Sequence, residues 1–185
     1  MNKIVAFVLL LAACGEDDPV SVSDSVDLKI TISSGDVAGG VVSADKNVNT
    51  ESGNPYGAFV QGARDEIGGD PTRITVDAAA LTLEATSSNV AGLGEVFSGA
   101  LVLGFEMNGS STVYPIATRT IVAADAGGPL ELEVDFDSDS IPDADYVDLA
   151  SGSFKVSVSG PAAATFEAAN ADADLLMTLT FSAFE

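Results

Sequence analysis

The sequence of 185 residues contains no histidine, no tryptophan and a single cysteine, Cys14. Without histidine there can be no Ser–His or Cys–His catalytic arrangement and no HExxH zinc site, and the usual general base near neutral pH is missing. One cysteine allows no disulfide within the chain and no metal site built from several thiolates. Packing rather than cross-linking must therefore stabilise the fold.

Basic side chains are also scarce: seven Lys and Arg residues stand against 28 Asp and Glu residues, giving a formal net charge of −21. This balance excludes nucleic acid as a partner, because phosphate binding needs a basic surface. It also disfavours a chain that lies flat on an anionic membrane. The charge favours cations as ligands or serves solubility. A salt-adapted organism would impose the same acidity on its exported proteins, so charge alone assigns no function.

The residues present in the chain support few kinds of catalysis. Neither a GxxxxGK[ST] loop nor a GxGxxG loop occurs between a strand and a helix. A hydrolase that uses only carboxylates is conceivable, since glycosidases need just two acids. Such enzymes bind sugars on aromatic platforms, and this chain offers only Tyr56, Tyr114 and Tyr146 besides phenylalanines. We therefore predict that the protein is not an enzyme.

The N-terminal segment is typical of a secretory signal. Lys3 precedes an apolar run, and small residues lead to the cysteine in Leu11-Ala12-Ala13-Cys14. The apolar stretch Ile4–Ala13 has ten residues, well short of the roughly 20 that span a membrane as a helix. A plain cleaved signal is the alternative, but it would not need the only cysteine at this point.

Leu11-Ala12-Ala13-Cys14 resembles the lipobox of bacterial lipoproteins. The resemblance implies that Cys14 is acylated and becomes the mature N-terminus, so that the membrane is a partner through the lipid anchor. Bacterial lipoproteins carry two or three acyl chains, which satisfies the need for more than one chain in stable anchoring. Gly15 rather than Asp follows the cysteine, which by the same resemblance favours the outer membrane of the cell envelope.

We divide the chain into three parts: a lipoprotein signal peptide over 1–13, an acidic, Ser-rich tether over 14–27 and a β domain over 28–185. In the β domain one short helix is predicted at 55–67, where Asn54 and Pro55 suit its start and Gly68-Gly69 its end. Apolar and polar residues alternate in most of the remaining segments, as in half-buried strands. These segments are 28–33, 74–77, 81–84, 96–107, 112–122, 130–136, 154–159 and 175–183, with a weak strand at 41–42.

About eight short strands separated by turn signals predict a mainly β fold, an antiparallel β-sandwich that is Ig-like or Greek-key in the loose sense. The cysteine pair and core tryptophan of true Ig domains are missing. Pro115 within a strand predicts an edge or a bulge. Residues 135–148 and the Ala-rich stretch after Pro161 are predicted to be loops.

Segment 135–148, here called the acidic segment, is the one stretch whose pattern suggests a metal site. Carboxylates at every second position suit Ca²⁺, which takes six to eight oxygen ligands from a curved loop. The segment resembles a single thrombospondin type 3-like calcium repeat of the form DxDxDxxPD. The candidate calcium ligands are Asp135, Asp137, Asp139, Asp143 and Asp145.

Two residues depart from an EF-hand-type loop that starts at Asp135. Ser140 stands where glycine makes the sharp turn, and Tyr146 stands where the closing carboxylate is expected. Charge runs are usually a solvated face, and that alternative stays open.

Taken together, the sequence predicts a non-enzymatic lipoprotein of the cell envelope that acts as a structural, binding or surface-interaction module. The alternative is a calcium-dependent adhesion or ligand-binding domain that uses the acidic segment. A protein or glycan partner is expected in either case, and the sequence does not identify it. No cofactor other than Ca²⁺ is suggested.

Overall fold

The computed structural model describes residues 20–49 and 54–185. Its strands are β1 (Ser21–Ser33), β2 (Val41–Val48), β3 (Arg73–Leu83), β4 (Gly99–Met107), β5 (Val113–Ile121), β6 (Leu130–Val134), β7 (Phe154–Pro161) and β8 (Asp172–Phe184). Its helices are α1 (Pro55–Ile67), α2 (Leu93–Val96), α3 (Asp143–Ser151) and α4 (Ala164–Ala169), with single 3₁₀ turns η1 (Ser34–Asp36) and η2 (Ser138–Ser140).

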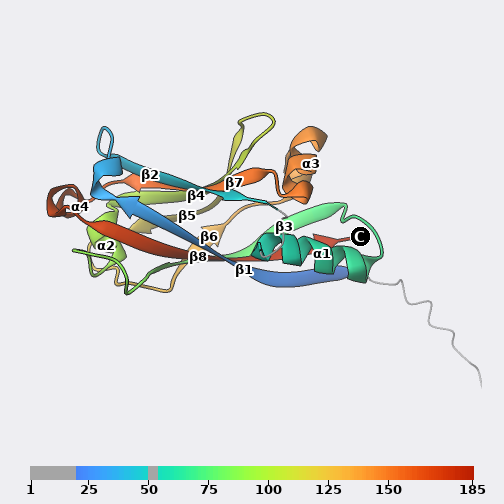
Figure 1. Cartoon of the computed structure of the whole chain (residues 1–185), viewed down its shortest axis with the longest axis horizontal. Coiled ribbons are helices and arrows are strands. Elements are labelled where there is room, and N and C mark those ends of the chain that lie inside the picture. The colour runs from blue at the N-terminus through green and yellow to red at the C-terminus, as the bar shows by residue number, and fades with distance from the viewer. Residues whose placement is uncertain (1–19, 50–53) are drawn as a thin grey trace, which may run out of the picture.

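All strand pairs are antiparallel and form one sheet in the order β1-β8-β3-β6-β5-β4-β7-β2. The sheet folds over into two layers, one with β1, β8 and β3 and the other with β5, β4, β7 and β2 (Figure 1). Strand β6 joins the layers, since its first half pairs with β3 and its second half with β5. The end strands β1 and β2 contact each other across the line that would close a barrel. The predicted mainly β, sandwich-like fold is confirmed.

The core lies between the two layers and follows the alternation of the strands. In β8 every second residue from Ala173 to Ala183 is buried, and the residues between them are partly exposed except Ser182, which is also buried. Six aromatic side chains of the core form a connected group of rings with mostly edge-to-face contacts. This group comprises Tyr56, Phe59, Phe105, Phe136, Phe154 and Phe181.

Helix α1 has the bounds that the sequence predicts. The Asn54 side chain accepts a hydrogen bond from the Tyr56 backbone N–H at 3.0 Å, and Pro55 occupies the first turn. Gly68 ends the helix in the left-handed conformation (φ 82°), and its N–H donates to Arg64 O. The apolar face of the helix is buried, with Phe59 and Tyr56 reaching the ring group.

The two ends of the domain carry different elements (Figure 1). At one end, here called the α1 end, the start of β1, the end of β8 and the start of β3 meet: Ser21 pairs with Phe184, and the Thr72 N–H donates to Phe184 O. Helices α1 and α3 lie at this end. The opposite α4 end contains η1, α2 and α4.

Several predicted boundaries are wrong. Strand β1 begins at Ser21, so residues 21–27, which we predict to be part of the tether, belong to the sheet and pair with β8. Strand β2 extends from Val41 to Val48 although only Val42 and Val48 are buried. Strand β2 pairs with β7 along its whole length, and this pairing rather than an apolar pattern decides the conformation of β2.

Two predicted loops are helical. The Ala-rich stretch after Pro161 contains α4, which buries Phe166. The acidic segment contains η2 and most of α3. Gly152 ends α3 in the left-handed conformation, and Asp143 and Asp145 lie in its first turn, where a helix dipole favours carboxylates.

Bulges account for the two irregular strands. The predicted bulge at Pro115 is confirmed, because the register of β4 and β5 shifts between Leu103 and Gly104 and leaves Ile116 as the extra residue. Strand β3 unites two strands that we predict separately. Its register with β8 shifts at Asp77, which interrupts the alternation.

Candidate functional site

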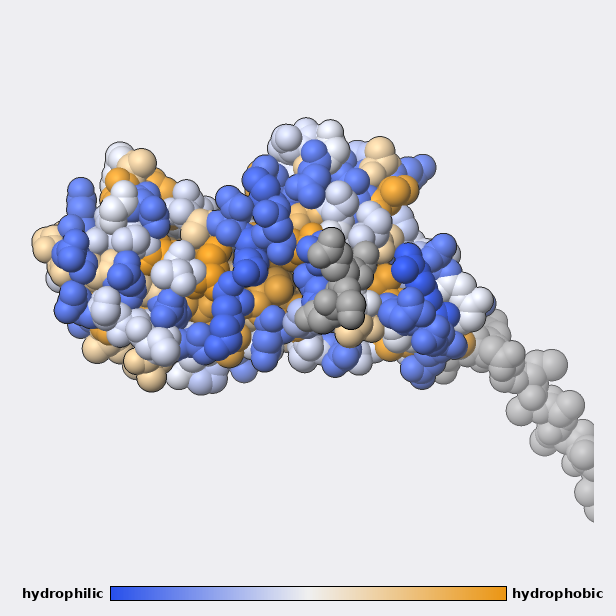
Figure 2. All heavy atoms as spheres, in the orientation of Figure 1, coloured by the Kyte–Doolittle hydropathy of each residue, from blue (hydrophilic) through white to orange (hydrophobic). Residues whose placement is uncertain are grey.

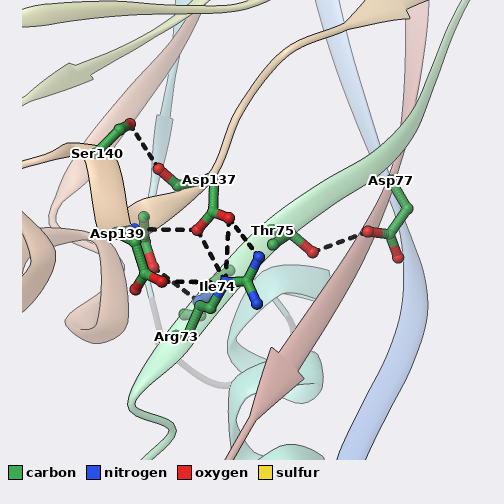
Figure 3. Close-up of polar contacts among 8 residues, drawn as sticks. Arg73, Ile74, Thr75, Asp77, Asp137, Asp139 and Ser140 are labelled. Atoms are coloured by element: carbon green, nitrogen blue, oxygen red, sulfur yellow. Dashed lines mark hydrogen bonds and ion pairs between the residues drawn. The ribbon is translucent and has the colours of Figure 1, made fainter.

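The acidic segment is attached to β3 through Asp137. The guanidinium of Arg73 donates from Nε to the two carboxylate oxygens of Asp137 at 2.9 and 3.1 Å, and its Nη2 donates to the same carboxylate (Figure 3). Asp139 Oδ2 lies 3.5 Å from Arg73 Nε. The hydrogen bond from Arg73 holds the pKa of Asp137 below its usual value, and Asp137 in turn raises the pKa of Arg73.

A neutral hydrogen bond completes this attachment, and a carboxylate farther along β3 joins β3 to β8. The hydroxyl of buried Ser138 accepts a hydrogen bond from the Ile74 backbone N–H at 2.8 Å. Next along β3, the bulged residue Asp77 accepts from Thr75 at 2.8 Å and from Ser182 on β8. Turn η2 is thus fixed against β3 by both an ion pair and a backbone hydrogen bond.

Two further carboxylates attach α3 to the β4–β5 hairpin. Asp145 is buried, with 5% of its surface exposed, and accepts a hydrogen bond from the Tyr114 hydroxyl. Asp148 accepts from the Gly109 backbone N–H at 2.7 Å. A side chain at position 109 would place its Cβ 2.8 Å from Asp148 Oδ2, so this approach depends on glycine. These two carboxylates therefore attach α3 to the β4–β5 hairpin.

Each of the three tyrosines of the chain donates a hydrogen bond that joins α3 to another element. Tyr56 of α1 donates to Leu149 O at 3.0 Å, Tyr114 of β5 donates to Asp145, and Tyr146 of α3 donates to Pro71 O. Burial raises the pKa of Tyr56 and of Tyr146, and the hydrogen bond to Asp145 raises the pKa of Tyr114. The hydroxyls are thus held in their neutral, donating form.

The five predicted calcium ligands do not converge. Asp137 and Asp139 face Arg73, Asp145 faces Tyr114, and Asp135 and Asp143 are exposed. Across 20–49 and 54–185, no group of three or more acidic, histidine or cysteine side chains is close enough to hold a metal ion. Calcium binding by the acidic segment stays a prediction, and it would require these side chains to leave their present partners.

A polar surface that sequence reasoning missed lies on the outside of the sheet around β6. Shallow hollows of about 460 and 450 Å³ flank this short strand and share Glu131. Carboxylates, threonine hydroxyls and short aliphatic side chains line them, and Arg119, whose Nη1 donates to Glu131 O at 2.7 Å, is the one basic group. The hollows lie where β6 crosses between the layers. No local sequence motif predicts this crossing.

Cys14, the predicted lipidation residue, lies outside the described residues together with the rest of the lipobox. The first strand begins seven positions later, at Ser21. Within the part of the chain that the structure describes, no helix is long and apolar enough to cross a membrane. The chain matches no protein-family model and no curated protein.

Proposed function

We propose that the protein is a non-enzymatic lipoprotein of the bacterial cell envelope, acylated at Cys14, whose β domain acts as a structural, binding or interaction module. The observation that carries the proposal is the complete lipobox Leu11-Ala12-Ala13-Cys14 behind a short apolar run. By resemblance, Gly15 directs the protein to the outer membrane.

The arrangement of ionisable groups supports a role without catalysis. Among the carboxylates of residues 20–49 and 54–185, a lowered pKa is found at Asp137, bonded by Arg73, and at Asp174, bonded by Thr31. Both contacts connect structural elements: the first joins η2 to β3 and the second joins β8 to β1. The polar hollows beside β6 offer a surface for a partner, which would be a protein or a glycan.

Membrane fractionation of Cys14→Ala tests the anchor. The wild-type protein should fractionate with membranes and partition into the detergent phase, and its intact mass should exceed that of the polypeptide from Cys14 onward by two or three acyl chains. Cys14→Ala should lose the acyl mass and leave the membrane fraction. Ser23→Ala, an exposed position in β1 that keeps the lipobox, is the matched control and should behave as wild type. Retention of Cys14→Ala in membranes would contradict the proposal.

A further inference from the structure

The position of the first strand limits how far the domain can lie from its proposed anchor. Seven residue steps separate Cys14 from Ser21. A fully extended chain covers at most about 3.3–3.6 Å per residue, so Ser21 can lie no more than about 25 Å from the Cys14 backbone. Ser21 belongs to the α1 end, where it pairs with Phe184.

The other end of the domain is out of reach of this segment. Strand β1 has 13 residues and runs from the α1 end to η1 at the α4 end (Figure 1). At about 3.3 Å per residue, the strand spans about 40 Å. An anchor at Cys14 can therefore bring the α1 end to the membrane surface, whereas the α4 end can approach the membrane only if the domain lies on its side.

Contact along the side of the domain is opposed by charge. Asp24 and Asp27 of β1, Asp45 of β2 and Glu131 and Glu133 of β6 are all exposed along the sheet. In Figure 2 hydrophilic residues are spread along the domain, with hydrophobic residues visible between them in the middle. An anionic bilayer surface repels such a face, and a zwitterionic one gains nothing from it.

The α1 end also carries exposed carboxylates, among them Asp65, Glu66 and Asp70, but it adds exposed aliphatic side chains. Val20 and Val147 are 41% and 63% exposed, and the Glu185 N–H donates to Val20 O beside the last pair of the β1–β8 ladder. Apolar atoms show on the surface over α3 (Figure 2). A shallow hollow of about 230 Å³ beside Val147 is lined by Pro71 and Ala150 together with Arg64 and Asp70, which form an ion pair at 2.6 Å. Exposed aliphatic groups suit the boundary region of a bilayer, and the Arg64–Asp70 pair adds no net charge beside them.

We infer that the α1 end of the domain faces the membrane and that the domain stands on it, with α2, α4 and η1 as the outermost part. This inference rests on the proposed function, because it requires a lipid at Cys14. It identifies the α4 end and the outside of the sheet as the surfaces open to other partners.

Site-specific labelling of the acylated full-length protein tests the orientation. With Cys14 acylated the protein has no free thiol, so one introduced cysteine is a unique labelling point. Gly69→Cys at the α1 end and Gly35→Cys in η1 are matched variants, since a Cβ at either glycine meets no atom closer than 4.0 Å and neither has positive φ. Each carries a fluorescent donor and is reconstituted into phosphatidylcholine vesicles that contain a headgroup-labelled acceptor lipid.

We expect energy transfer to be several-fold greater from position 69 than from position 35. Equal transfer would show a domain lying on its side, and greater transfer from position 35 would show the opposite end at the membrane; either result overturns the inference. Intact mass and flotation of the same samples test the anchor separately. A protein without acyl chains that fails to float with the vesicles would overturn the proposed function and, with it, the inference, whereas an acylated protein with equal transfer overturns the orientation alone.

Discussion

Helices α1 and α3 pack at the same end of the domain but are held there by different forces. Helix α1 buries an apolar face, with Phe59 against Phe181 at a centroid distance of 5.5 Å. Helix α3 buries Leu149 as its only large apolar residue and is otherwise attached through Asp145, Asp148 and the tyrosine hydroxyls. An apolar attachment is strong and insensitive to pH, whereas a polar attachment is weaker and depends on the ionisation of its groups.

The largest effect is expected from truncation of the apolar attachment. Phe59 is 2% exposed, and its replacement in Phe59→Ala removes ring contacts with Tyr56 and Phe181 and leaves a cavity. Such changes reduce the free energy of unfolding by about 3–5 kcal/mol. Urea unfolding of the non-acylated protein measures the loss, and Gln61→Ala on the exposed face of the same helix should change it by less than about 0.5 kcal/mol. Equal effects of the two substitutions would contradict the buried position of Phe59.

A smaller loss of unfolding free energy is expected when a hydrogen bond that attaches α3 to β5 is removed. Tyr114→Phe and Asp145→Ala each remove the hydrogen bond between these side chains, and each should lower the free energy of unfolding by about 1–3 kcal/mol. The double variant should lose clearly less than the sum, because the second change removes a bond that is already broken. Asp143→Ala, at an exposed carboxylate two residues away, is the control. Strictly additive losses would mean that the bond does not hold α3.

Alkaline pH should weaken the attachment of α3, whereas the contact between Phe59 and Phe181 contains no ionisable group. All three tyrosines have a raised pKa in the folded protein. Their stabilising contribution is therefore complete below the ordinary tyrosine pKa of about 10 and is lost as the pH rises through the raised values. The free energy of unfolding should fall in this range, and Tyr114→Phe should make the fall shallower. The ultraviolet absorbance of phenolate, unobscured by tryptophan, should show titration above the ordinary pKa until the protein unfolds.

The same experiment on Phe59→Ala measures how the loss of unfolding free energy at an apolar contact depends on pH. That loss should be the same at neutral and alkaline pH, since no ionisable group is removed. If it changed with pH as much as the loss caused by Tyr114→Phe, the division into an apolar and a polar attachment would be wrong.

The same two helices show what the sequence can predict. Helix α1 is predictable because Asn54, Pro55 and Gly68 mark its ends and its apolar residues share one face. Helix α3 also has local signals, namely acidic residues in the first turn and Gly152 after the last. The density of carboxylates in the acidic segment suggests a solvated loop or a calcium site and obscures these signals.

The partners of the acidic segment could not be predicted at all. Arg73 lies 64 residues before Asp137, and Tyr114 lies 31 residues before Asp145. Only the topology brings them together, because β3 and the β4–β5 hairpin both run to the end of the domain where α3 packs. The start of β1 was missed for a related reason: its first residues alternate weakly, and their pairing with β8 gives them a strand conformation.

The smallest effect is expected from calcium. Calcium binding at the acidic segment would have to separate Asp137 from Arg73 and Asp145 from Tyr114. The loss of these contacts would reduce the free energy of calcium binding. We therefore expect the midpoint of thermal unfolding of the non-acylated protein to differ little between excess EDTA and millimolar Ca²⁺, and no more than with Mg²⁺. A calcium-specific rise in the midpoint would show binding linked to folding. If Asp137→Asn with Asp139→Asn abolished that rise, the segment would have to rearrange into the repeat-like loop that its sequence resembles; if the rise persisted, the cation would bind elsewhere.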